Sequence, residues 1–360
     1  MKIIVAPDSF KGTLSATEVA NTIAEVLRAA IDGIEVLTLP LADGGEGLVD
    51  CIAASMGAQM VSAKVSGPLG NLVDAKFAIA GDLAVIEMAE AAGLPLLDKP
   101  DVMHATTYGV GELIAAAEDR GAKRILLGLG GSATNDMGCG MAAALGCRFW
   151  DGKQFFVPVG GTLRQIKRID YAEPHNVIAL CDVKNPLYGK TGAAYVYGPQ
   201  KGAKEGDLRE LDAGLRHVAA LLQADGKSGF AQEGAGAAGG LGAGVIAFLG
   251  GTLRRGIDAV LDTMRFAELA ADADLVITGE GRLDSQSFAG KVIDGVIAHS
   301  KCPVVAVVGQ ADEALDYAAY GLQAVFSTAR HLVGDDYKAQ AHQTLLSAAK
   351  ELADWIAHNL

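Results

Sequence analysis

Short apolar runs alternate with helical segments at the start of the chain. The run KIIVAPD predicts a buried strand, and SATEVANTIAEVLRAAI after it has the apolar spacing of a helix with Ser15 as its N-cap. IEVLTLPLAD predicts a second strand and EGLVDCIAASMG a second helix, which Gly57 would close. This order of strand, helix, strand and helix favours a parallel sheet.

The same alternation returns near the other end of the chain. Strands are predicted in ADLVITGEG, CPVVAVVGQ and QAVFST, and helices in GKVIDGVIAHS, DEALDYAAYG and a closing segment from about Tyr337. The two ends together supply five strands, enough for a small doubly wound sheet. We therefore predict one domain built from residues 1–60 and 263–360. Two consecutive domains are the alternative.

The middle of the chain, residues 61–262, has a mixed pattern and is predicted to be an inserted α/β domain. LAVIEMAEAAGL, KRILLGLGG, HNVIALCDV and AAYVYGPQ are interpreted as strands or strand edges. GVGELIAAAEDRG and LRELDAGLRHVAALLQAD are interpreted as helices. GAGAAGGLGAG suits a tight loop or a helix packed closely on another backbone. The predicted fold class is thus α/β, with two α/β domains.

Composition supports a compact enzyme. At 360 residues the chain is long for one core, and half of the residues are apolar while 20% are charged. The net charge of −13, with no basic stripe among aromatics, argues against a nucleic-acid partner. An odd number of cysteines, five, without CxxC spacing indicates reduced thiols. Because no signal peptide or membrane-spanning run is evident, we expect a cytoplasmic protein without a membrane partner.

Polar side chains follow each of the first two predicted strands. APDSFKG offers Asp8, Ser9 and Lys11, where backbone N–H groups and the lysine suit an anion; an ordinary turn is the alternative. LADGGEG places Asp43 and Glu46 around two glycines. Its two carboxylates suit Mg²⁺, although Glu46 would also favour the start of a helix.

A third loop of the predicted terminal domain has the same character. GEGRLDSQS contributes Glu280, Arg282, Asp284, Ser285 and Gln286. The planar guanidinium of Arg282 can hold a carboxylate or phosphate at two points, unless it pairs with Asp284 or Glu280. Because such loops meet at the carboxyl edge of a parallel sheet, we expect a ligand there.

The middle segment holds further candidates. GLGGSATNDMGCGMAAALG, residues 128–146, matches neither a P-loop, since it lacks a lysine, nor a dinucleotide fingerprint. Asp182 ends a predicted strand, as metal-ligating or proton-accepting aspartates often do, and Lys201 follows a Pro-containing turn. The histidines are isolated from one another, so no zinc site is expected.

Seven motifs resemble, in order, those of bacterial glycerate kinases: MKIIVAPDSFKGTLSA, PLADGGEG, GLGGSATND, CDVKNPLYG, GPQKGA, GAGAAGGLG and ITGEGRLDSQS. The resemblance extends from Met1 to about Phe326. It implies ATP-dependent, Mg²⁺-requiring phosphorylation of D-glycerate, usually to 2-phosphoglycerate. It also implies a Rossmann- or flavodoxin-like domain built from both termini, a second α/β domain, and an active site in the cleft between them. Alternatives are formation of 3-phosphoglycerate, a kinase for a related hydroxy acid, and a non-catalytic binding protein.

Under this resemblance the candidate residues receive hypothetical roles. The catalytic candidates are Lys11, Asp43, Asp182 and Arg282. The candidates for binding substrate are Ser9, Arg282, Asp284, Ser285 and Gln286. The candidates for binding nucleotide are Gly130, Gly131, Ser132, Thr134, Asn135 and Lys201. The candidates for binding Mg²⁺ are Asp43, Asp136 and Asp182. We expect a monomer or homodimer.

One position departs from the family pattern. The family commonly continues SATND with two glycines, whereas this chain has Met137 and Gly138. The larger side chain does not suit a role that needs a positive φ or a bare backbone at this position, whereas a helix that began by Met137 would tolerate it.

Overall fold

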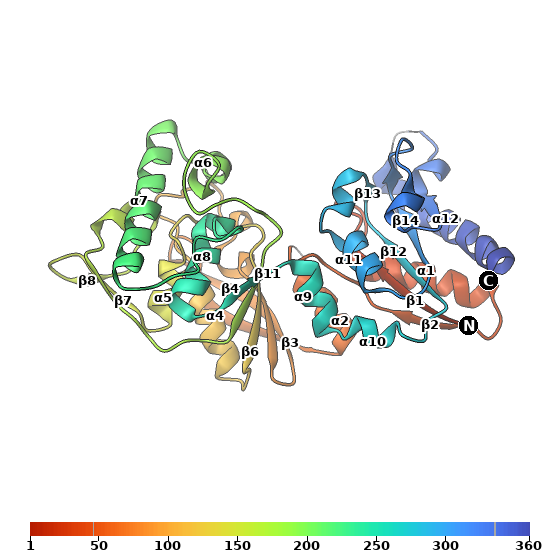
Figure 1. Ribbon diagram of the computed structural model, residues 1–360, viewed down its shortest axis with the longest axis horizontal. Helices are drawn as coiled ribbons and strands as arrows, with labels where there is room; N and C mark the ends of the chain where they lie inside the picture. The colour runs from red at the N-terminus through yellow and green to blue at the C-terminus, as the bar shows by residue number, and fades with distance from the viewer. Residues whose placement is uncertain (46, 335) are drawn as a thin grey trace. The chain divides into compact units, whose positions relative to one another are not determined.

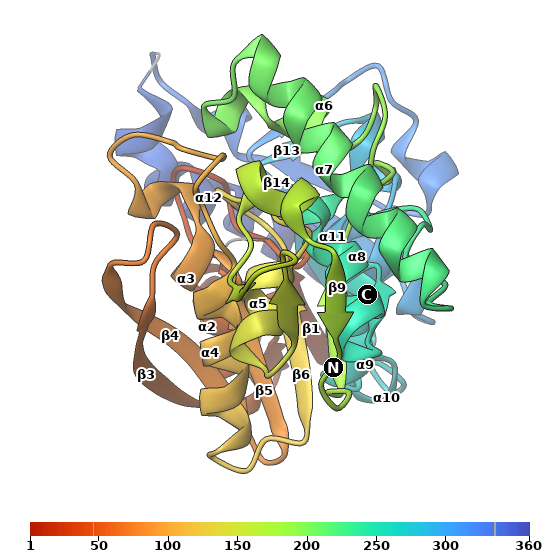
Figure 2. The ribbon, with the colours of Figure 1, turned by 90° about the vertical axis from the view of Figure 1, so that its left-hand side faces the viewer.

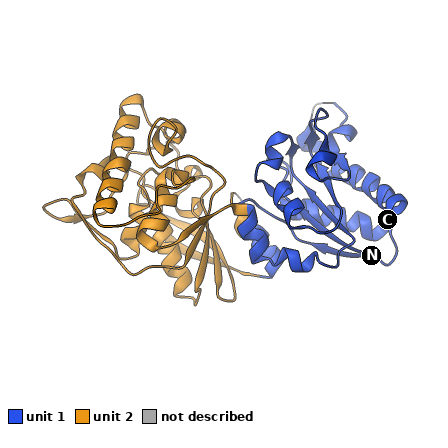
Figure 3. Ribbon diagram, viewed as in Figure 1, with its two compact units in different colours: residues 1–43, 50–57, 257–360 blue, residues 44–49, 58–256 orange. Residues whose placement is uncertain are grey.

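The computed structural model describes residues 1–45, 47–334 and 336–360. They form two compact units, which Figure 3 colours separately. Unit 1 consists of residues 1–43, 50–57 and 257–360, and unit 2 of residues 44–49 and 58–256. Both ends of the chain therefore belong to unit 1.

A five-stranded parallel sheet forms the centre of unit 1 (Figure 1). Its strands are β1 (Lys2–Pro7), β2 (Glu35–Thr38), β12 (Leu275–Gly279), β14 (Val304–Val308) and β16 (Val325–Ser327). The order across the sheet is β16-β14-β12-β1-β2, and every pair is parallel. The prediction of a parallel sheet built from both ends of the chain is confirmed. Counted along the chain this order is 2-1-3-4-5, in which ligands bind where β1 meets the third strand, here β12.

The helices of unit 1 cover this sheet and close its core. They are α1 (Ala16–Ala30), most of α2 (Leu48–Met56), most of α9 (Gly256–Thr263), α10 (Phe266–Leu269), α11 (Val292–His299) and α12 (Tyr337–Asn359). Helix α1 begins as predicted, because Ser15 and Glu18 form a reciprocal capping box. Helix α1 packs against α12 (Figure 1). On the buried face of α1, Ile23 and Leu27 belong to the same apolar cluster as Leu352 and Ile356 of α12. The first and last helices thus share a core.

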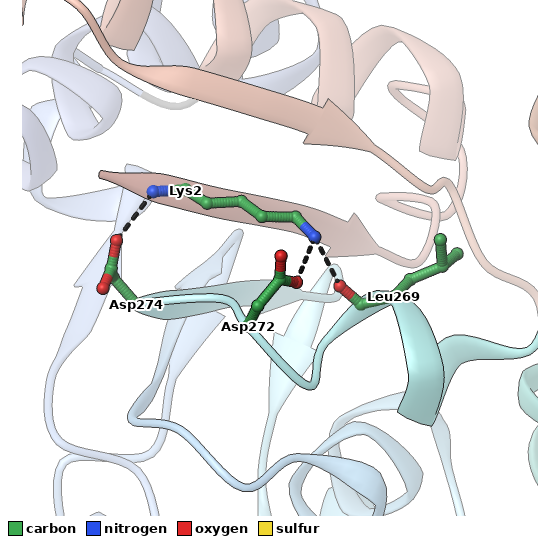
Figure 4. A network of polar contacts seen from close by, with 4 residues as sticks. All are labelled: Lys2, Leu269, Asp272 and Asp274. Atoms are coloured by element: carbon green, nitrogen blue, oxygen red, sulfur yellow. Dashed lines mark hydrogen bonds and ion pairs between the residues drawn. The ribbon is translucent and has the colours of Figure 1, made fainter.

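Polar contacts tie β1 to the segment that precedes β12 (Figure 4). The Lys2 backbone N–H donates to the Asp274 carboxylate at 2.7 Å. The Lys2 ammonium donates to the Leu269 carbonyl at 2.9 Å and also contacts the Asp272 carboxylate. These contacts hold together strands that are more than 260 residues apart in the chain.

Unit 2 contains a mixed six-stranded sheet, as predicted for the middle of the chain. Its strands are β3 (Gln59–Ser66), β4 (Leu72–Ala80), β5 (Leu83–Glu87), β6 (Arg124–Gly128), β10 (Val177–Leu180) and β11 (Thr252–Arg254). The order is β11-β10-β6-β5-β4-β3, antiparallel at the β3 edge and parallel from β5 to β11. A small antiparallel sheet adds β7 (Arg148–Trp150), β8 (Phe155–Phe156) and β9 (Arg168–Asp170).

Helices surround the larger sheet of unit 2. They are α3 (Ala89–Ala92), α4 (Tyr108–Glu118), α5 (Cys139–Ala144), α6 (Ala193–Tyr197), α7 (Glu205–Ala224) and α8 (Ala237–Leu249). Helix α4 packs on α5 and on β3, β4 and β5 (Figure 2). The 3-10 helices of the two units are η1 (Leu94–Leu96), η2 (Gly160–Gln165), η3 (Pro199–Lys201), η4 (Ser285–Phe288), η5 (Tyr317–Tyr320) and η6 (Thr328–His331).

Two predicted elements are wrong. AAYVYGPQ is not a strand edge but the helix α6 followed by η3, because a short apolar run does not by itself distinguish strand from helix. DEALDYAAYG forms no α-helix; only its end is helical, as η5, and Asp316 caps that 3-10 turn by accepting from the Ala319 N–H. Aspartates that bond local backbone groups favour such turns.

The glycine-rich segment of α8 approaches another backbone closely. Ala238, Gly239 and Gly240 have positive φ values of 52°, 67° and 90°, so the helix is kinked there. A Cβ atom on Gly239 would lie 2.0 Å from the Thr134 carbonyl oxygen, and one on Gly244 would lie 2.3 Å from that of Met137. The prediction of a helix packed closely on another backbone is confirmed, and the partner is the loop that follows β6.

Candidate functional site

Two carboxylates stand side by side at the carboxyl edge of the unit 1 sheet. Pro7, the last residue of β1, pairs with Gly279, the last residue of β12. Asp8 follows Pro7, and its backbone N–H donates to the Gly279 carbonyl at 2.8 Å. Glu280 follows Gly279 on the adjacent strand. Asp8 and Glu280 therefore occupy the point of the sheet at which such folds bind ligands.

Burial and like charge raise the pKa of Asp8 to about 7. Burial is the larger cause, and the carboxylates of Asp43 and Glu280 add repulsion. Hydrogen bonds from Ser9 oppose the rise, including one from its backbone N–H to Asp8 Oδ1 at 2.6 Å. Asp8, Asp43 and Glu280 thus act on one another as a cluster.

Glu280 is the most buried member of this cluster, with 5% of its surface exposed. Its Oε1 atom has no hydrogen-bond partner among the described residues. Burial raises the pKa of Glu280, while the Ser287 hydroxyl and the Lys291 ammonium oppose the rise. Asp8 and Glu280 are among the polar loop residues evident in the sequence, but neither was predicted to have a role. Each lies at the end of a predicted strand segment, KIIVAPD or ADLVITGEG, and this position was the available signal.

Arg282 lies on the same edge but points largely into solvent. It belongs to β13 (Arg282–Leu283), which pairs with β15 (Gln310–Ala311). Its side chain is 74% exposed, and its Nε atom lies 3.6 Å from Asp284 Oδ2. The alternative pairing with Asp284 is therefore present, although it leaves most of the guanidinium accessible.

The predicted substrate residues after Arg282 form a short 3-10 turn. Asp284 caps η4 and accepts the Gln286 backbone N–H at 2.9 Å. Ser285 and Gln286 are exposed. The capping bond gives Asp284 a structural task, while a substrate role for any of the three stays a prediction.

A cavity of about 330 Å³ opens beside these loops within unit 1. The residues that line it include Phe10, Lys11, Thr13, Gln310, Thr328 and Tyr337. Gly281 and Gly309 contribute bare backbone to its wall. Its volume is in the range of small-molecule sites, roughly 300–1,000 Å³, and Lys11 gives it a cation. Ser9, on the same loop, is half-buried.

In unit 2, the loop after β6 exposes its first residues and buries the rest. Gly130 and Gly131 are exposed, and Gly131 has a positive φ of 73°. Ser132, Thr134, Asn135 and Asp136 are buried. The Thr134 hydroxyl oxygen and both amide atoms of Asn135 have no hydrogen-bond partner among the described residues.

Lys201, which lies in η3, contacts this loop. The structure thus brings Lys201 together with two other predicted nucleotide-binding residues, Ser132 and Thr134. The lysine is 2% exposed, and its ammonium donates to Ser132 Oγ at 2.6 Å and to the Thr134 carbonyl at 2.7 Å. Burial lowers the pKa of Lys201 to about 7, and the Asp136 carboxylate opposes that change. Lys201 is therefore an internal brace of the loop.

Asp136 is fully buried and makes four hydrogen bonds. Its Oδ2 accepts from the Thr107 N–H and hydroxyl, each at 2.8 Å, and from the Gly140 N–H at 3.2 Å. Its Oδ1 accepts from the Gly138 N–H at 3.1 Å. Burial raises the pKa of Asp136, and these bonds oppose the rise. The contacts favour an anchoring role, and metal binding by Asp136 stays a prediction.

Met137 adopts a conformation that few residues other than glycine tolerate. Its φ is 55°, its side chain is fully buried, and α5 begins only at Cys139. The helix that would tolerate methionine at this position therefore does not begin there, and Met137 itself adopts the positive φ. Packing of the side chain in the unit 2 core offsets a backbone cost of roughly 1–2 kcal/mol.

The remaining carboxylate candidates are positioned differently. Asp182 follows β10, is exposed, and accepts the Gly256 backbone N–H at 2.9 Å, where α9 begins. Asp43 belongs to the unit 1 cluster, and Glu46 lies outside the described residues. Within the described ranges, no group of three or more His, Cys, Asp or Glu side chains could hold a metal ion.

The model of the glycerate kinase family matches residues 3–357, nearly the whole chain. The chain belongs to the glycerate kinase family. The glycerate 2-kinase of Escherichia coli K12 is 42% identical, and the alignment covers 99% of this chain and 98% of that protein. The glycerate kinase of Halalkalibacterium halodurans is also 42% identical, with 98% and 97% covered.

A solved structure is similar to this glycerate kinase family member in fold as well as sequence. The crystal structure of a protein assigned as glycerate kinase 2 in Salmonella typhimurium LT2 has a TM-score of 0.89 and 40% identity. The match covers 99% of this chain and 98% of that one. The protein is thus a phosphotransferase of the glycerate kinase type, as the resemblance implied. No helix in the part of the chain that the structure describes is both long and apolar enough to span a membrane.

Proposed function

We propose that this protein transfers the γ-phosphoryl group of ATP to the 2-hydroxyl of D-glycerate in a Mg²⁺-dependent reaction, yielding 2-phosphoglycerate and ADP. The observation that carries the proposal is the nearly full-length match to glycerate kinases, among them the glycerate 2-kinase of Escherichia coli. Kinase membership supports ATP as the donor.

Glycerate is proposed to bind at the carboxyl edge of the unit 1 sheet. Arg282 would hold the substrate carboxylate, because its exposed guanidinium offers two parallel N–H donors. Lys11 and Ser9 would add a cation and a hydroxyl from the loop after β1. Asp284, Ser285 and Gln286 would orient Arg282 and contribute polar contacts. A carboxylate held at two points fixes which hydroxyl reaches the phosphoryl donor.

The loop after β6 in unit 2 is proposed to meet the nucleotide phosphates. Gly130 and Gly131 expose backbone at the carboxyl end of a strand, where an anion can approach N–H groups closely. Ser132, Thr134, Asn135 and Lys201 are buried, so they would act by holding this backbone in place.

Two further tasks, binding Mg²⁺ and accepting the proton of the substrate hydroxyl, are proposed for carboxylates. Mg²⁺ prefers carboxylate oxygens as ligands, and Asp43 and Asp182 both follow strands. Either aspartate could bind Mg²⁺, and either could accept the proton of the reacting hydroxyl. When bound, Mg²⁺ neutralises negative charge on the phosphoryl groups. The protein contributes mainly by positioning the acceptor hydroxyl, because phosphoryl transfer has a loose transition state.

Incubation with MgATP and D-glycerate, followed by phosphorus NMR of the products, tests this proposal. We expect ADP and the resonance of 2-phosphoglycerate, with L-glycerate as the stereochemical control. The resonance of 3-phosphoglycerate would correct the position of transfer. If tartronate or lactate gives faster ADP release than glycerate, that hydroxy acid is the preferred substrate. Ligand binding without ADP release would contradict the proposal.

A further inference from the structure

The cavity of unit 1 is lined from four neighbouring strands. β16, β14, β12 and β1 are consecutive in the sheet and parallel, so their carboxyl ends lie at one edge. The chain just after each of these strands supplies a lining residue, in the same order Thr328, Gly309, Gly281 and Phe10. Neighbouring strands are about 4.8 Å apart, so the row of four strand ends spans roughly 14 Å. The lining thus comes from a length of sheet edge and not from one strand.

This cavity is larger than glycerate requires. Its volume is about 330 Å³. A cavity of about 150 Å³ is enough to hold benzene, a molecule close to glycerate in size. Glycerate alone would therefore leave about half of the space to water, and a longer ligand would use it fully.

Charge and apolar surface come from opposite ends of the row of strands. Lys11 is exposed and belongs to the loop after β1. Leu332, Tyr337 and Ala341 belong to the chain after β16, where α12 packs on η6 and β16 (Figure 1). A ligand with a negative group at one end and a flat apolar ring at the other matches this lining.

The threonine hydroxyls of the lining can meet a ligand only as acceptors. Thr328 Oγ1 donates to the Gly309 carbonyl at 3.1 Å, and Thr13 Oγ1 donates to the Phe10 carbonyl at 2.7 Å. The Thr344 hydroxyl also donates to carbonyls of its own helix. Because a hydroxyl has one proton, these groups offer a ligand their lone pairs alone. A ligand that carries N–H or O–H donors beside its ring fits them.

We propose that this cavity binds the adenosine part of ATP, with Lys11 at the phosphate end. A nucleobase has a flat face that stacks on aromatic side chains such as Tyr337. The amino group of adenine and the hydroxyls of ribose supply donors for the acceptors of the lining. The assignment rests on the proposed function for ATP as the phosphoryl donor. It adds a nucleoside subsite in unit 1 to the phosphate-binding loop proposed in unit 2.

The competing explanation is that glycerate and water share the cavity. Filling the space from α12 separates the two. Ala341 is half-buried and lines the cavity, so Ala341→Leu narrows it at the apolar end. Ala339→Leu makes the same change two residues away, at an exposed position outside the lining, and is the matched control.

Calorimetric titration of the full-length proteins with ADP measures the effect. We expect Ala341→Leu to weaken ADP binding by about tenfold or more, because added side-chain carbons occupy space that the ligand needs. Ala339→Leu should bind like the wild type. In steady-state kinetics, Ala341→Leu should raise KM for ATP and leave KM for glycerate unchanged. Unchanged ADP affinity, or a rise in KM for glycerate alone, would overturn the proposal.

Photolabelling needs no variant, so misfolding of a variant cannot decide the matter. Irradiation of the wild type with 8-azido-ATP should label peptides that carry Leu332 or Tyr337, as mass spectrometry of a digest would show. ADP should prevent this labelling, and glycerate should not. Absence of the label from these peptides would contradict the site. Because titration and photolabelling involve no turnover, failure of this site and failure of glycerate phosphorylation are separate results.

Discussion

At the residue scale, Lys201 is a buried cation whose charge destabilises the folded state. It is 2% exposed, and burial lowers its pKa to about 7. Below that pH both the folded and the unfolded chain carry the proton. Between about 7 and the ordinary value of 10.5 the unfolded chain binds more protons, so the free energy of unfolding should rise with pH.

The prediction for Lys201 is therefore a difference in pH dependence. Between pH 7 and 9 the wild type should gain stability relative to Lys201→Met, by at most about 1.4 kcal/mol per pH unit. Urea unfolding at several pH values measures this difference. Lys204→Met changes an exposed lysine nearby and should follow the wild type. A gap between wild type and Lys201→Met that does not change with pH would show that Lys201 stays charged.

Arg282 allows a second test at the scale of one side chain. Because its guanidinium is proposed to hold the glycerate carboxylate at two points, Arg282→Ala should raise KM for glycerate by about tenfold or more. KM for ATP should change little. Arg282→Lys keeps the positive charge but lacks the planar guanidinium, so its KM for glycerate should lie between those of the wild type and Arg282→Ala. Steady-state kinetics measure these constants. An unchanged KM for glycerate in Arg282→Ala would refute the proposal that Arg282 holds the substrate carboxylate.

At the element scale, the kink of α8 holds the loop after β6 in place. Gly239 has a positive φ of 67°. It lies so close to the Thr134 carbonyl that a Cβ atom on this residue would be 2.0 Å from the carbonyl oxygen, which leaves no room for a side chain. The Lys201 ammonium donates a hydrogen bond to the same carbonyl at 2.7 Å. The loop is therefore fixed by a glycine contact and a lysine contact at one residue.

Gly239→Ala should disturb this arrangement. The new Cβ would meet backbone at 2.0 Å, so we expect a loss of about 3 kcal/mol or more in the free energy of unfolding. KM for ATP should rise as the loop shifts. Gly206→Ala in α7 is the control, because a Cβ there meets nothing within 4 Å and alanine favours a helix. Denaturant unfolding and ATP kinetics report both effects, and a neutral Gly239→Ala would contradict them.

At the scale of the whole molecule, each unit contains its own core and one tryptophan. Trp150 belongs to the small sheet of unit 2, whereas Trp355 lies in α12 of unit 1 and contacts Phe326 edge-on. The chain has two tryptophans, so Trp150→Phe and Trp355→Phe each leave one fluorescent reporter. Unfolding of the two units can therefore be followed separately.

Glycerate should stabilise the unit that binds it. At a concentration about 100 times its Kd, a ligand adds about 2.7 kcal/mol to the stability of the folded state. We expect D-glycerate to raise the unfolding midpoint reported by Trp355 more than that reported by Trp150. Denaturant titrations of the two single-tryptophan variants measure this. A shift confined to Trp150 would place the substrate in unit 2 and refute the proposed role of Arg282.

Much of the element pattern was readable from local chemistry. Ser15 and Glu18 form the predicted cap, and apolar runs such as those around Val276 and Val305 are the predicted strands. The failures have local causes as well. AAYVYGPQ is too short for its apolar spacing to separate helix from strand, and Met137 has a positive φ that its residue type disfavours.

The sequence by itself determined most element types, the family and the loops that carry polar groups, because these depend on residues close together in the chain. Only the tertiary structure decided which groups meet. Strand order placed Asp8 next to Glu280 across more than 270 residues, and packing buried Lys201 against Ser132 and Thr134. Burial, charge coupling and unpartnered atoms depend on neighbours that are distant in the chain, and local residue patterns do not contain them.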